Sequence, residues 1–162
     1  MPVNKENQSC YYVSPVGVLK IHATAKGISA IQFLGDMGLS QEHLPIPAHP
    51  FLDQTVEQLN EYFEGRRQEF SIPLAPKGTP FQFEVWDALM EIPYGITCSY
   101  GEVAAAIGRP RASRAVGRAN NANPLPILIP CHRVIGADGS LVGYGGGLEI
   151  KKKLLALEQE YF

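Results

Sequence analysis

The sequence predicts an α+β protein in which a small sheet-and-helix domain is followed by a mainly helical domain. Apolar and polar residues alternate between positions 18 and 24, which is typical of a half-buried strand. Apolar residues recur at helical spacing through most of the second half, and residues 74–78, with two helix breakers, separate the two patterns. We therefore place the domains at residues 1–75 and 79–162.

The first domain is predicted to contain a small sheet and one helix. Strands are expected over residues 11–13, 18–24 and 28–33, with a turn at 25–27. Leu52, Val56, Leu59 and Phe63 share one helical face up to Gly65, which predicts a helix. Residues 70–72 are predicted to form a returning strand, so that this domain is a small α+β unit.

Two clear helix starts open the second domain. Thr79 can cap a helix that begins at Pro80, and Gln82 completes a capping box. Ser99 and Glu102 form a second capping box before a short helix that ends near residue 108. A further helix is expected over 112–120. Because the two short helices flank a glycine-containing turn, they form a helix-turn-helix candidate.

The positive charge of the chain is concentrated in this candidate. The net charge is −2, but residues 99–133 hold five arginines against one glutamate, whereas residues 1–98 are acidic. Phosphate binding depends on local rather than average charge, and arginine suits bidentate phosphate contacts. We therefore expect this section to face a nucleic acid, with a solvated basic surface as the alternative explanation of the charge.

The helix over 112–120 combines very small side chains with arginine. Ser113, Ala115 and Gly117 offer little to read base edges in a major groove, but they allow the backbone to approach a nucleic acid closely. This pattern favours minor-groove contact, with Arg114 as the side chain that inserts into the base stack. Close packing of this helix on a neighbouring helix is the competing interpretation.

A reactive thiol is indicated where the apolar run 127–130 ends in Cys131 and His132. We expect the run to be a buried strand that delivers the cysteine to a surface. A free thiol has a pKa near ~8.5 and is only partly ionised at neutral pH, so it needs a base, and His132 is the nearest candidate. The three cysteines are odd in number and scattered, which indicates a reducing compartment rather than a disulfide framework.

Two segments after Cys131 complete the candidate site. Residues 136–147 contain six glycines, which predicts an irregular loop whose backbone can approach a ligand. The final helix is expected to bury Ile150, Leu154, Leu157 and Tyr161 and to expose the lysines at 151–153. Glu158 lies beside that stripe, and a partly buried carboxylate needs a partner, for which we propose His132.

Together these motifs resemble the O6-alkylguanine-DNA alkyltransferase family. The resemblance rests on Pro-Cys-His-Arg-Val at 130–134, on Asn-Pro at 123–124, and on Gly-Tyr at 143–144 with the glycine pair at 146–147. It extends over residues 79–158 and includes 93–95, 99–102 and 113–117 at consistent spacing. It implies a ribonuclease-H-like first domain and a winged-helix-like helix-turn-helix in the second.

The resemblance also implies chemical roles for five residues. Cys131 would accept the alkyl group, His132 would act through a water as its base, and Glu158 would polarise His132. Asn123 would hold the turn beneath the site. Tyr100 would donate a hydrogen bond to guanine N3 as negative charge grows on the departing base. The reaction would be single-turnover and irreversible, because its product is a thioether on Cys131.

Further residues would bind DNA and the flipped base. Arg114 would fill the gap left by the nucleotide, and the backbone at Cys131 and Val134 would read the guanine amine. The amide of Gly145 would reach O6. Other expected DNA contacts are Ser113, Ala115, Gly117 and Arg118, and other expected pocket residues are Tyr144, Val142 and Gly146. The implied partner is double-stranded DNA that contains O6-alkylguanine, with O4-alkylthymine as a further substrate to test.

No cofactor is expected. Cys10, His22, His43 and His49 are not spaced as a recognisable zinc site, so no metal is predicted. The sequence has no apolar stretch of about 18 residues and no secretion signal, which predicts a cytoplasmic protein without a membrane segment. Nothing in the sequence calls for an obligate oligomer, and we expect a monomer.

Three other classes of protein share some of these features. A non-catalytic protein that binds alkylated DNA lesions would lack the acceptor, so Cys131 argues against it. A helix-turn-helix transcription regulator could use the first domain as a sensor, but the alanine-rich helix is poorly equipped for base readout. A cysteine hydrolase usually takes its histidine from a distant segment, whereas His132 directly follows Cys131.

Overall fold

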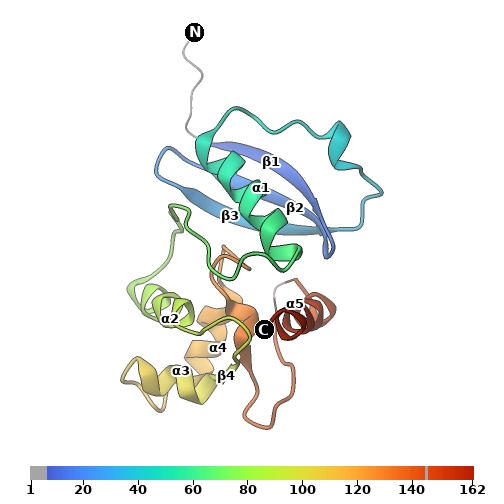
Figure 1. Ribbon diagram of the computed structural model, residues 1–162. Coiled ribbons are helices and arrows are strands. Elements are labelled where there is room, and N and C mark those ends of the chain that lie inside the picture. The colour runs from blue at the N-terminus through green and yellow to red at the C-terminus, as the bar shows by residue number, and fades with distance from the viewer. Residues whose placement is uncertain (1–6, 145) are drawn as a thin grey trace. The chain divides into compact units, whose positions relative to one another are not determined.

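The computed structural model describes residues 7–144 and 146–162 and contains two compact units, Met1–Lys77 and Gly78–Phe162 (Figure 1). The first unit combines an antiparallel sheet with a helix, and the second is mainly helical. The predicted α+β class is confirmed.

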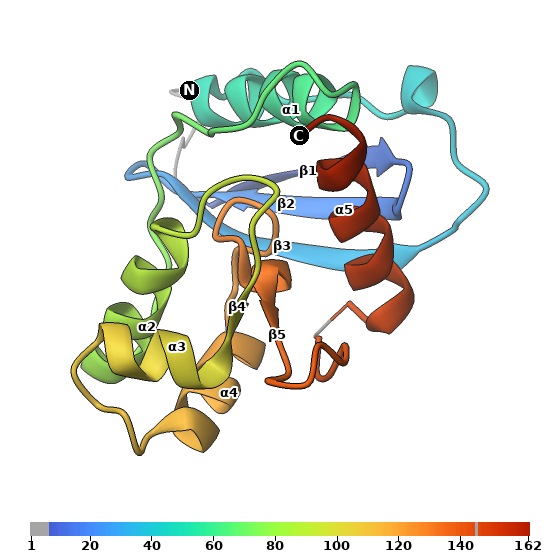
Figure 2. The same cartoon turned by 60° about the horizontal axis from the view of Figure 1, so that its bottom comes forward.

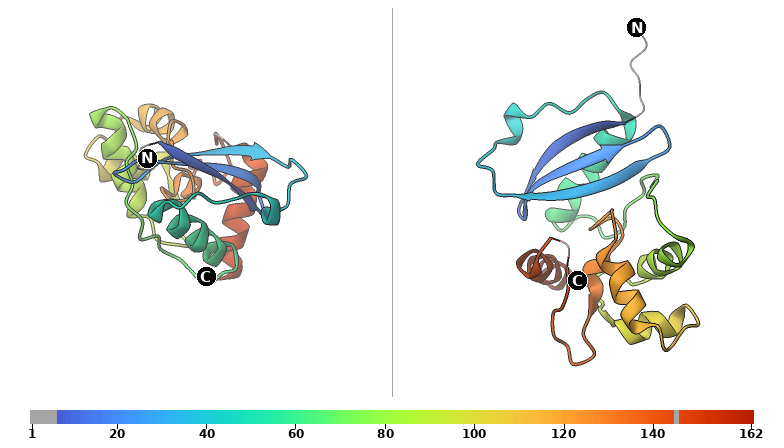
Figure 3. Two further views of the ribbon diagram at one scale, coloured as in Figure 1. Left: turned by 90° about the horizontal axis from the view of Figure 1, so that it is seen from above. Right: turned by 180° about the vertical axis from the view of Figure 1, so that it is seen from behind.

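Residues 7–77 of the first unit form a three-stranded sheet in the order β1 (Gln8–Ser14), β2 (Gly17–Ala23) and β3 (Ile28–Gly35). A 3₁₀ turn, η1 (Gln41–His43), follows, and helix α1 (Pro50–Phe63) packs across one face of the sheet (Figures 1 and 3). Leu19 and Ile21 of β2 and Leu59 of α1 are fully buried. These apolar residues form the core of the unit because period-two and helical patterns point them at one another.

The predicted strand over 70–72 is wrong. The amide of Ser71 donates to the Gln58 side chain at 2.9 Å rather than to a strand, and Pro73 has no N–H to offer. Only an isolated bridge joins Ile28 to Leu74, in which the Ile28 amide donates to the Pro73 carbonyl at 2.9 Å. The segment therefore follows the sheet edge without extending its hydrogen-bond ladder.

The described residues of the second unit form four α-helices: α2 (Pro80–Met90), α3 (Tyr100–Ala106), α4 (Ser113–Asn121) and α5 (Leu148–Glu160). Both predicted capping boxes, Thr79 with Gln82 and Ser99 with Glu102, are confirmed. The indole Nε1 of the buried Trp86 donates to the Ala119 carbonyl at 2.9 Å and ties α2 to α4. Figure 2 shows α3 and α4 following one another as the helix-turn-helix prediction requires.

A parallel pair of short strands lies beside these helices in the same unit (Figure 2). Strand β4 (Cys98–Ser99) leads into α3, and β5 (Val134–Ile135) follows a 3₁₀ turn, η2 (Cys131–Arg133). Val134, whose backbone is predicted to contact the guanine, is buried in β5. This pairing joins the start of the helix-turn-helix to the segment that carries the reactive cysteine.

The apolar run before Cys131 is a buried turn, so the predicted strand over 127–130 is wrong. The Ile129 amide donates to the Leu125 carbonyl at 2.8 Å, and Ile127 has a φ of 73°. Prolines at 126 and 130 lack the amide donors that a ladder needs. The run is apolar because the turn is enclosed by the unit, and it places Cys131 in a buried rather than an exposed position.

The buried face of α5 also differs from the prediction. Lys151, Leu154 and Glu158 are its buried residues, whereas Tyr161 is exposed. Lysines at 152 and 153 are exposed as predicted, but Lys151 has none of its surface exposed. The helix therefore turns two charged side chains, spaced seven residues apart, into the interior of the second unit.

Candidate active site

Cys131 lies in the 3₁₀ turn η2 and is 4% exposed. Burial raises the pKa of its thiol to about 11, because a thiolate is poorly solvated there. A hydrogen bond from Asn123 and the charge of Lys151 act in the opposite direction. The resting side chain is therefore a thiol that needs a base before it can react.

His132, which follows Cys131 in the same turn, forms a buried pair with Glu158. His132 Nε2 lies 2.5 Å from Glu158 Oε2, and the two side chains are 0% and 1% exposed. Burial lowers the pKa of His132 despite the nearby carboxylate. Burial favours a protonated Glu158, but hydrogen bonds from His132 and Arg133, together with the guanidinium charge, hold the pKa of that carboxyl well below its usual range.

These pKa directions fix the proton arrangement of the pair. Glu158 is ionised and can only accept, so Nε2 of a neutral His132 carries the proton that is donated to it. The lone pair is then on Nδ1, which has no hydrogen-bond partner among the described residues. His132 Nδ1 is consequently the ring nitrogen that can accept a proton.

Arg133 completes the network, although its place in the basic section 99–133 predicted a contact with phosphate. Its Nε donates to Glu158 Oε1 at 2.8 Å, and its Nη2 donates to Oε2 at 3.2 Å. Nη1 donates to the Ile92 carbonyl at 2.8 Å, and the guanidinium lies over the Tyr94 ring. Arg133 is 6% exposed, so the expectation that it faces a nucleic acid is wrong. The other four arginines of that section are exposed: Arg109, Arg111, Arg114 and Arg118.

Two asparagines hold the backbone around the thiol. Asn123 Nδ2 donates to the Ile129 carbonyl, and its Oδ1 accepts from the Leu125 amide, both at 2.9 Å. It therefore braces both sides of the turn that precedes Cys131. Asn120 is 1% exposed and its Nδ2 donates to the Cys131 carbonyl at 3.3 Å. Sequence reasoning did not assign Asn120 to the site, although an amide on the buried face of α4 was a signal.

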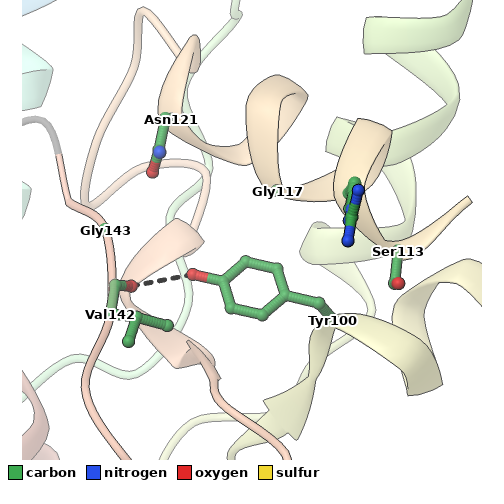
Figure 4. Close-up of a pocket in the computed structure, with 7 residues that line it drawn as sticks. Tyr100, Ser113, Gly117, Asn121, Val142 and Gly143 are labelled. Atoms are coloured by element: carbon green, nitrogen blue, oxygen red, sulfur yellow. Dashed lines mark hydrogen bonds between the residues drawn. The ribbon is translucent and has the colours of Figure 1, made fainter.

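An open pocket of about 370 Å³ lies between α3, α4 and the loop that follows β5 (Figure 4). The Tyr100 hydroxyl projects across it and donates to the Val142 carbonyl at 2.8 Å. Gly117 faces the Tyr100 ring, where a Cβ would come to 3.7 Å. The lining residues are Tyr100, Ser113, Arg114, Gly117, Asn121, Val142 and Gly143.

The pocket brings together five of the predicted site residues and adds two. Tyr100, Ser113, Arg114, Gly117 and Val142 were predicted; Asn121 and Gly143 were not assigned. A Cβ on Gly143 would come to 3.0 Å from the Asn121 side chain, so this pair packs closely. The predicted residues Ala115, Arg118, Val134, Tyr144 and Gly146 do not line this pocket, and Gly145 lies outside the described residues.

A negative charge on Cys131 raises the pKa values of three further side chains. Burial and the charge of Cys131 raise the pKa of Tyr100, and the same two causes raise the pKa of Tyr144 well above its usual value, with Glu158 contributing there. Burial lowers the pKa of Lys151, while a thiolate at Cys131 would raise it. These residues come from α3, the loop after β5 and α5, so three segments converge on the thiol.

The described part of the chain contains no cluster of three or more His, Cys, Asp or Glu side chains that could hold a metal ion. Within the same residues, no helix has the length and apolar character needed to cross a membrane.

Comparison with known proteins gives matches over both units. Residues 9–76 match the model for the 6-O-methylguanine DNA methyltransferase, ribonuclease-like domain, and residues 80–160 match that for the 6-O-methylguanine DNA methyltransferase, DNA binding domain. A methylated-DNA--protein-cysteine methyltransferase of Methanosarcina barkeri is 48% identical over 151 residues, covering 90% of this chain and 93% of the relative.

Solved structures agree with these sequence matches. The Mycobacterium tuberculosis O6-methylguanine methyltransferase is 42% identical with a TM-score of 0.82, covering 97% of this chain and 94% of that one. Mycobacterium tuberculosis OGT in complex with DNA is 46% identical with a TM-score of 0.83, covering 93% and 92%. The similarity therefore includes both units and the segment that carries Cys131.

Proposed function

The chain belongs to the 6-O-methylguanine DNA methyltransferase family, and on that premise we propose that it repairs O6-alkylguanine in duplex DNA by transferring the alkyl group to Cys131. The observation that carries the choice of acceptor is the buried His132–Glu158 pair, whose histidine directly follows Cys131 in the turn η2. Cys98 is a partly buried thiol whose pKa is raised by burial and by the charge of Glu102, which disfavours its thiolate.

The proposed reaction starts with proton transfer from the Cys131 thiol to His132 Nδ1, through a water. Glu158 stabilises the imidazolium because its ionised carboxylate already accepts the Nε2 proton. The thiolate then forms a sulfur–carbon bond to the alkyl group while the carbon–O6 bond breaks. The electron pair stays on the guanine, which takes up a proton as it leaves. The thioether product is stable, so each molecule acts once.

Base recognition is assigned to the pocket between α3, α4 and the loop after β5. A base within a duplex must be extruded to reach a buried thiol. Arg114 is proposed to fill the resulting gap from α4, while Tyr100 donates to guanine N3. Ser113, Ala115, Gly117 and Arg118 are proposed DNA contacts on the same helix, which suits the minor groove because its small side chains permit close approach. Tyr144, Gly145, Gly146, Val134 and Val142 are proposed to surround the base.

We propose a cytoplasmic location for the chain, because its chemistry requires a reduced thiol. All three cysteines are free, and oxidation of Cys131 would remove the acceptor. We also propose that the protein acts as a monomer, since every residue assigned to the reaction belongs to one copy of the second unit.

The direct test is intact mass spectrometry after incubation with duplex DNA that contains one O6-methylguanine. We expect one added methyl group per molecule, located on the peptide that contains Cys131, and no addition in Cys131→Ala. Repaired DNA together with unmodified protein would contradict a single-use acceptor. A methyl group on Cys98 or Cys10 would contradict the assignment of Cys131.

A second experiment tests the role of Arg114. Arg114→Ala should slow transfer from duplex DNA much more than transfer from free O6-benzylguanine, because the free base needs no extrusion. Arg111→Ala, an exposed arginine that precedes α4, is the matched control for charge. Equal losses of Arg114→Ala on the two substrates would exclude a role in filling the gap.

A further inference from the structure

Lys151 is a buried lysine that takes no part in the reaction steps proposed above. Its side chain is among the largest that are fully enclosed, with 0% exposure, although the next two residues of α5, Lys152 and Lys153, are exposed. Lysine is almost never fully buried without a paired charge. Among the described residues it forms no ion pair, and its Nζ donates to the Val142 carbonyl at 3.0 Å.

The Val142 carbonyl accepts from two donors on different helices. Tyr100 Oη of α3 donates to it at 2.8 Å, and Lys151 Nζ of α5 donates at 3.0 Å. A carbonyl oxygen has two lone pairs, so both are in use. Figure 4 shows the Tyr100 hydroxyl pointing at Val142 across the pocket. Tyr100 must give up this bond before it can donate to a base.

Lys151, as the second donor, lowers the free-energy cost of moving the Tyr100 hydrogen bond from the Val142 carbonyl to a base. If Tyr100 were the sole protein donor, its departure would leave only water to pair with the carbonyl of the exposed Val142, and the loop would lose its hydrogen bond to the helices. Lys151 keeps this carbonyl paired and keeps the loop joined to α5. Tyr100 can therefore turn to the base while the pocket wall stays in place.

The ammonium group of Lys151 also acts on the reacting groups. Its charge favours the thiolate form of Cys131 and disfavours the imidazolium form of His132. The other titratable groups near the thiol are Tyr100 and Tyr144, which a thiolate would keep protonated. The charge of Arg133 is neutralised by its ion pair with Glu158. Among the described residues, Lys151 is therefore the cation whose charge favours the thiolate of Cys131.

We propose that Lys151 is a positioning residue of the transfer reaction, which holds the Val142 carbonyl when Tyr100 turns to the base and stabilises the Cys131 thiolate. This inference rests on the proposed transfer to Cys131. It explains why a costly buried charge is placed on the inner face of α5 rather than an apolar side chain. A purely structural lysine would instead stabilise the unit, and the two possibilities make opposite predictions.

The test replaces Lys151 by methionine, which has a similar length and neither charge nor donor. Because replacing a buried charge by an apolar side chain is often neutral or stabilising, the melting temperature of Lys151→Met should equal or exceed that of the wild type. Alkylation of Cys131 by iodoacetamide at neutral pH, followed on its peptide by mass spectrometry, should fall about tenfold for each unit by which the thiol pKa rises. The pH midpoint of that alkylation should move upward.

Two matched variants separate the parts of the inference. Lys151→Gln keeps an N–H donor without the charge, so it should restore part of the rate of methyl transfer from duplex DNA while leaving the alkylation midpoint raised. Lys152→Met removes the adjacent, exposed lysine of α5 and should match the wild type in every measurement. Activity lost by Lys151→Met together with a lowered melting temperature would overturn the inference in favour of a structural lysine.

The failure of this inference is distinguishable from the failure of the proposed function. Wild-type protein that takes no methyl group from the duplex refutes the proposed transfer itself. Wild-type protein that is methylated on Cys131, with Lys151→Met reacting at the same rate and with the same pH midpoint, refutes the role of Lys151 alone.

Discussion

Replacing Arg133 with methionine is expected to lower the unfolding free energy of the second unit by about 3–5 kcal/mol, the usual cost of removing one partner from a buried ion pair. The guanidinium makes two hydrogen bonds to Glu158 and one to the Ile92 carbonyl. With Arg133 absent, that carbonyl loses its donor. Glu158 keeps His132 and the Gly95 amide as partners, which limits the cost to this range.

The measurement can be confined to the unit that contains the mutation. The chain has one tryptophan, Trp86, and it is buried in α2 of the second unit, so its fluorescence during urea titration reports the unfolding of that unit. Arg118→Met is the matched control, since Arg118 is an exposed arginine. Its stability should stay within about 0.5 kcal/mol of the wild type.

The two variants should behave in the opposite way towards DNA. If Arg118 contacts a phosphate, Arg118→Met should weaken DNA binding and reduce the slope of log affinity against log salt by about 1. Arg133→Met should leave this slope unchanged in the folded protein, because the buried guanidinium cannot reach a phosphate. A stability loss below about 1 kcal/mol for Arg133→Met, or a reduced salt slope in that variant, would refute the reasoning.

Two further predictions concern stability. Gly78→Ala should destabilise the second unit by about 1–3 kcal/mol, because the added Cβ would lie 2.5 Å from the Trp86 ring. The control Gly101→Ala in α3 should be neutral or stabilising, because its Cβ would meet only Ser99 Oγ, at 3.8 Å. Urea titration of both variants measures the two effects, and equal losses of stability would contradict this prediction. Burial raises the pKa of Cys131 from 9.0 to about 11, so its contribution of about 3 kcal/mol is present below pH ~9 and is lost as the pH rises towards 11. The unfolding free energy of Cys131→Ala should therefore fall less between pH 8 and pH ~10.5 than that of the wild type, and parallel curves would count against the raised pKa.

Features set by neighbouring residues were predictable from the sequence. The capping boxes at Thr79 and Ser99 need only side chains three residues away, and both were found where the sequence placed them. The sheet was likewise predictable, because alternation in β2 assigns its two faces without knowledge of the rest of the fold. The division between Lys77 and Gly78 falls within the segment that carries two helix breakers.

Features that depend on distant partners were not predictable in the same way. The run before Cys131 is apolar because it is enclosed, and apolar composition does not distinguish a buried turn from a buried strand. Arg133 and Lys151 were assigned to exposed surfaces because isolated cations prefer water. Their burial depends on Glu158 and on the Val142 carbonyl, which only the folded chain brings to them.

In the candidate site, too, some contacts were predictable from the sequence and others were not. The sequence proposed that Glu158 meets His132, and the structure places their side chains in contact. It did not assign Asn120, Arg133 or Lys151 a place around the thiol. These residues share one property, which is that each side chain donates a hydrogen bond to a backbone carbonyl distant in the sequence. The carbonyls belong to Cys131, Ile92 and Val142 respectively, and no side-chain motif identifies them as acceptors.

The arrangement of charges around Cys131 suits an acceptor that can be used once. A freely ionised thiolate would react with any alkylating agent that reached it, and each such event would consume the protein. Burial raises the pKa of the thiol and keeps it protonated at rest, while in the proposed reaction a neutral His132 accepts its proton and the charge of Lys151 favours the thiolate. Glu158 and Arg133 neutralise each other, so they orient His132 without adding a large net charge to the site. In the proposed reaction, the thiol therefore stays protonated until a base binds and Tyr100 leaves the Val142 carbonyl.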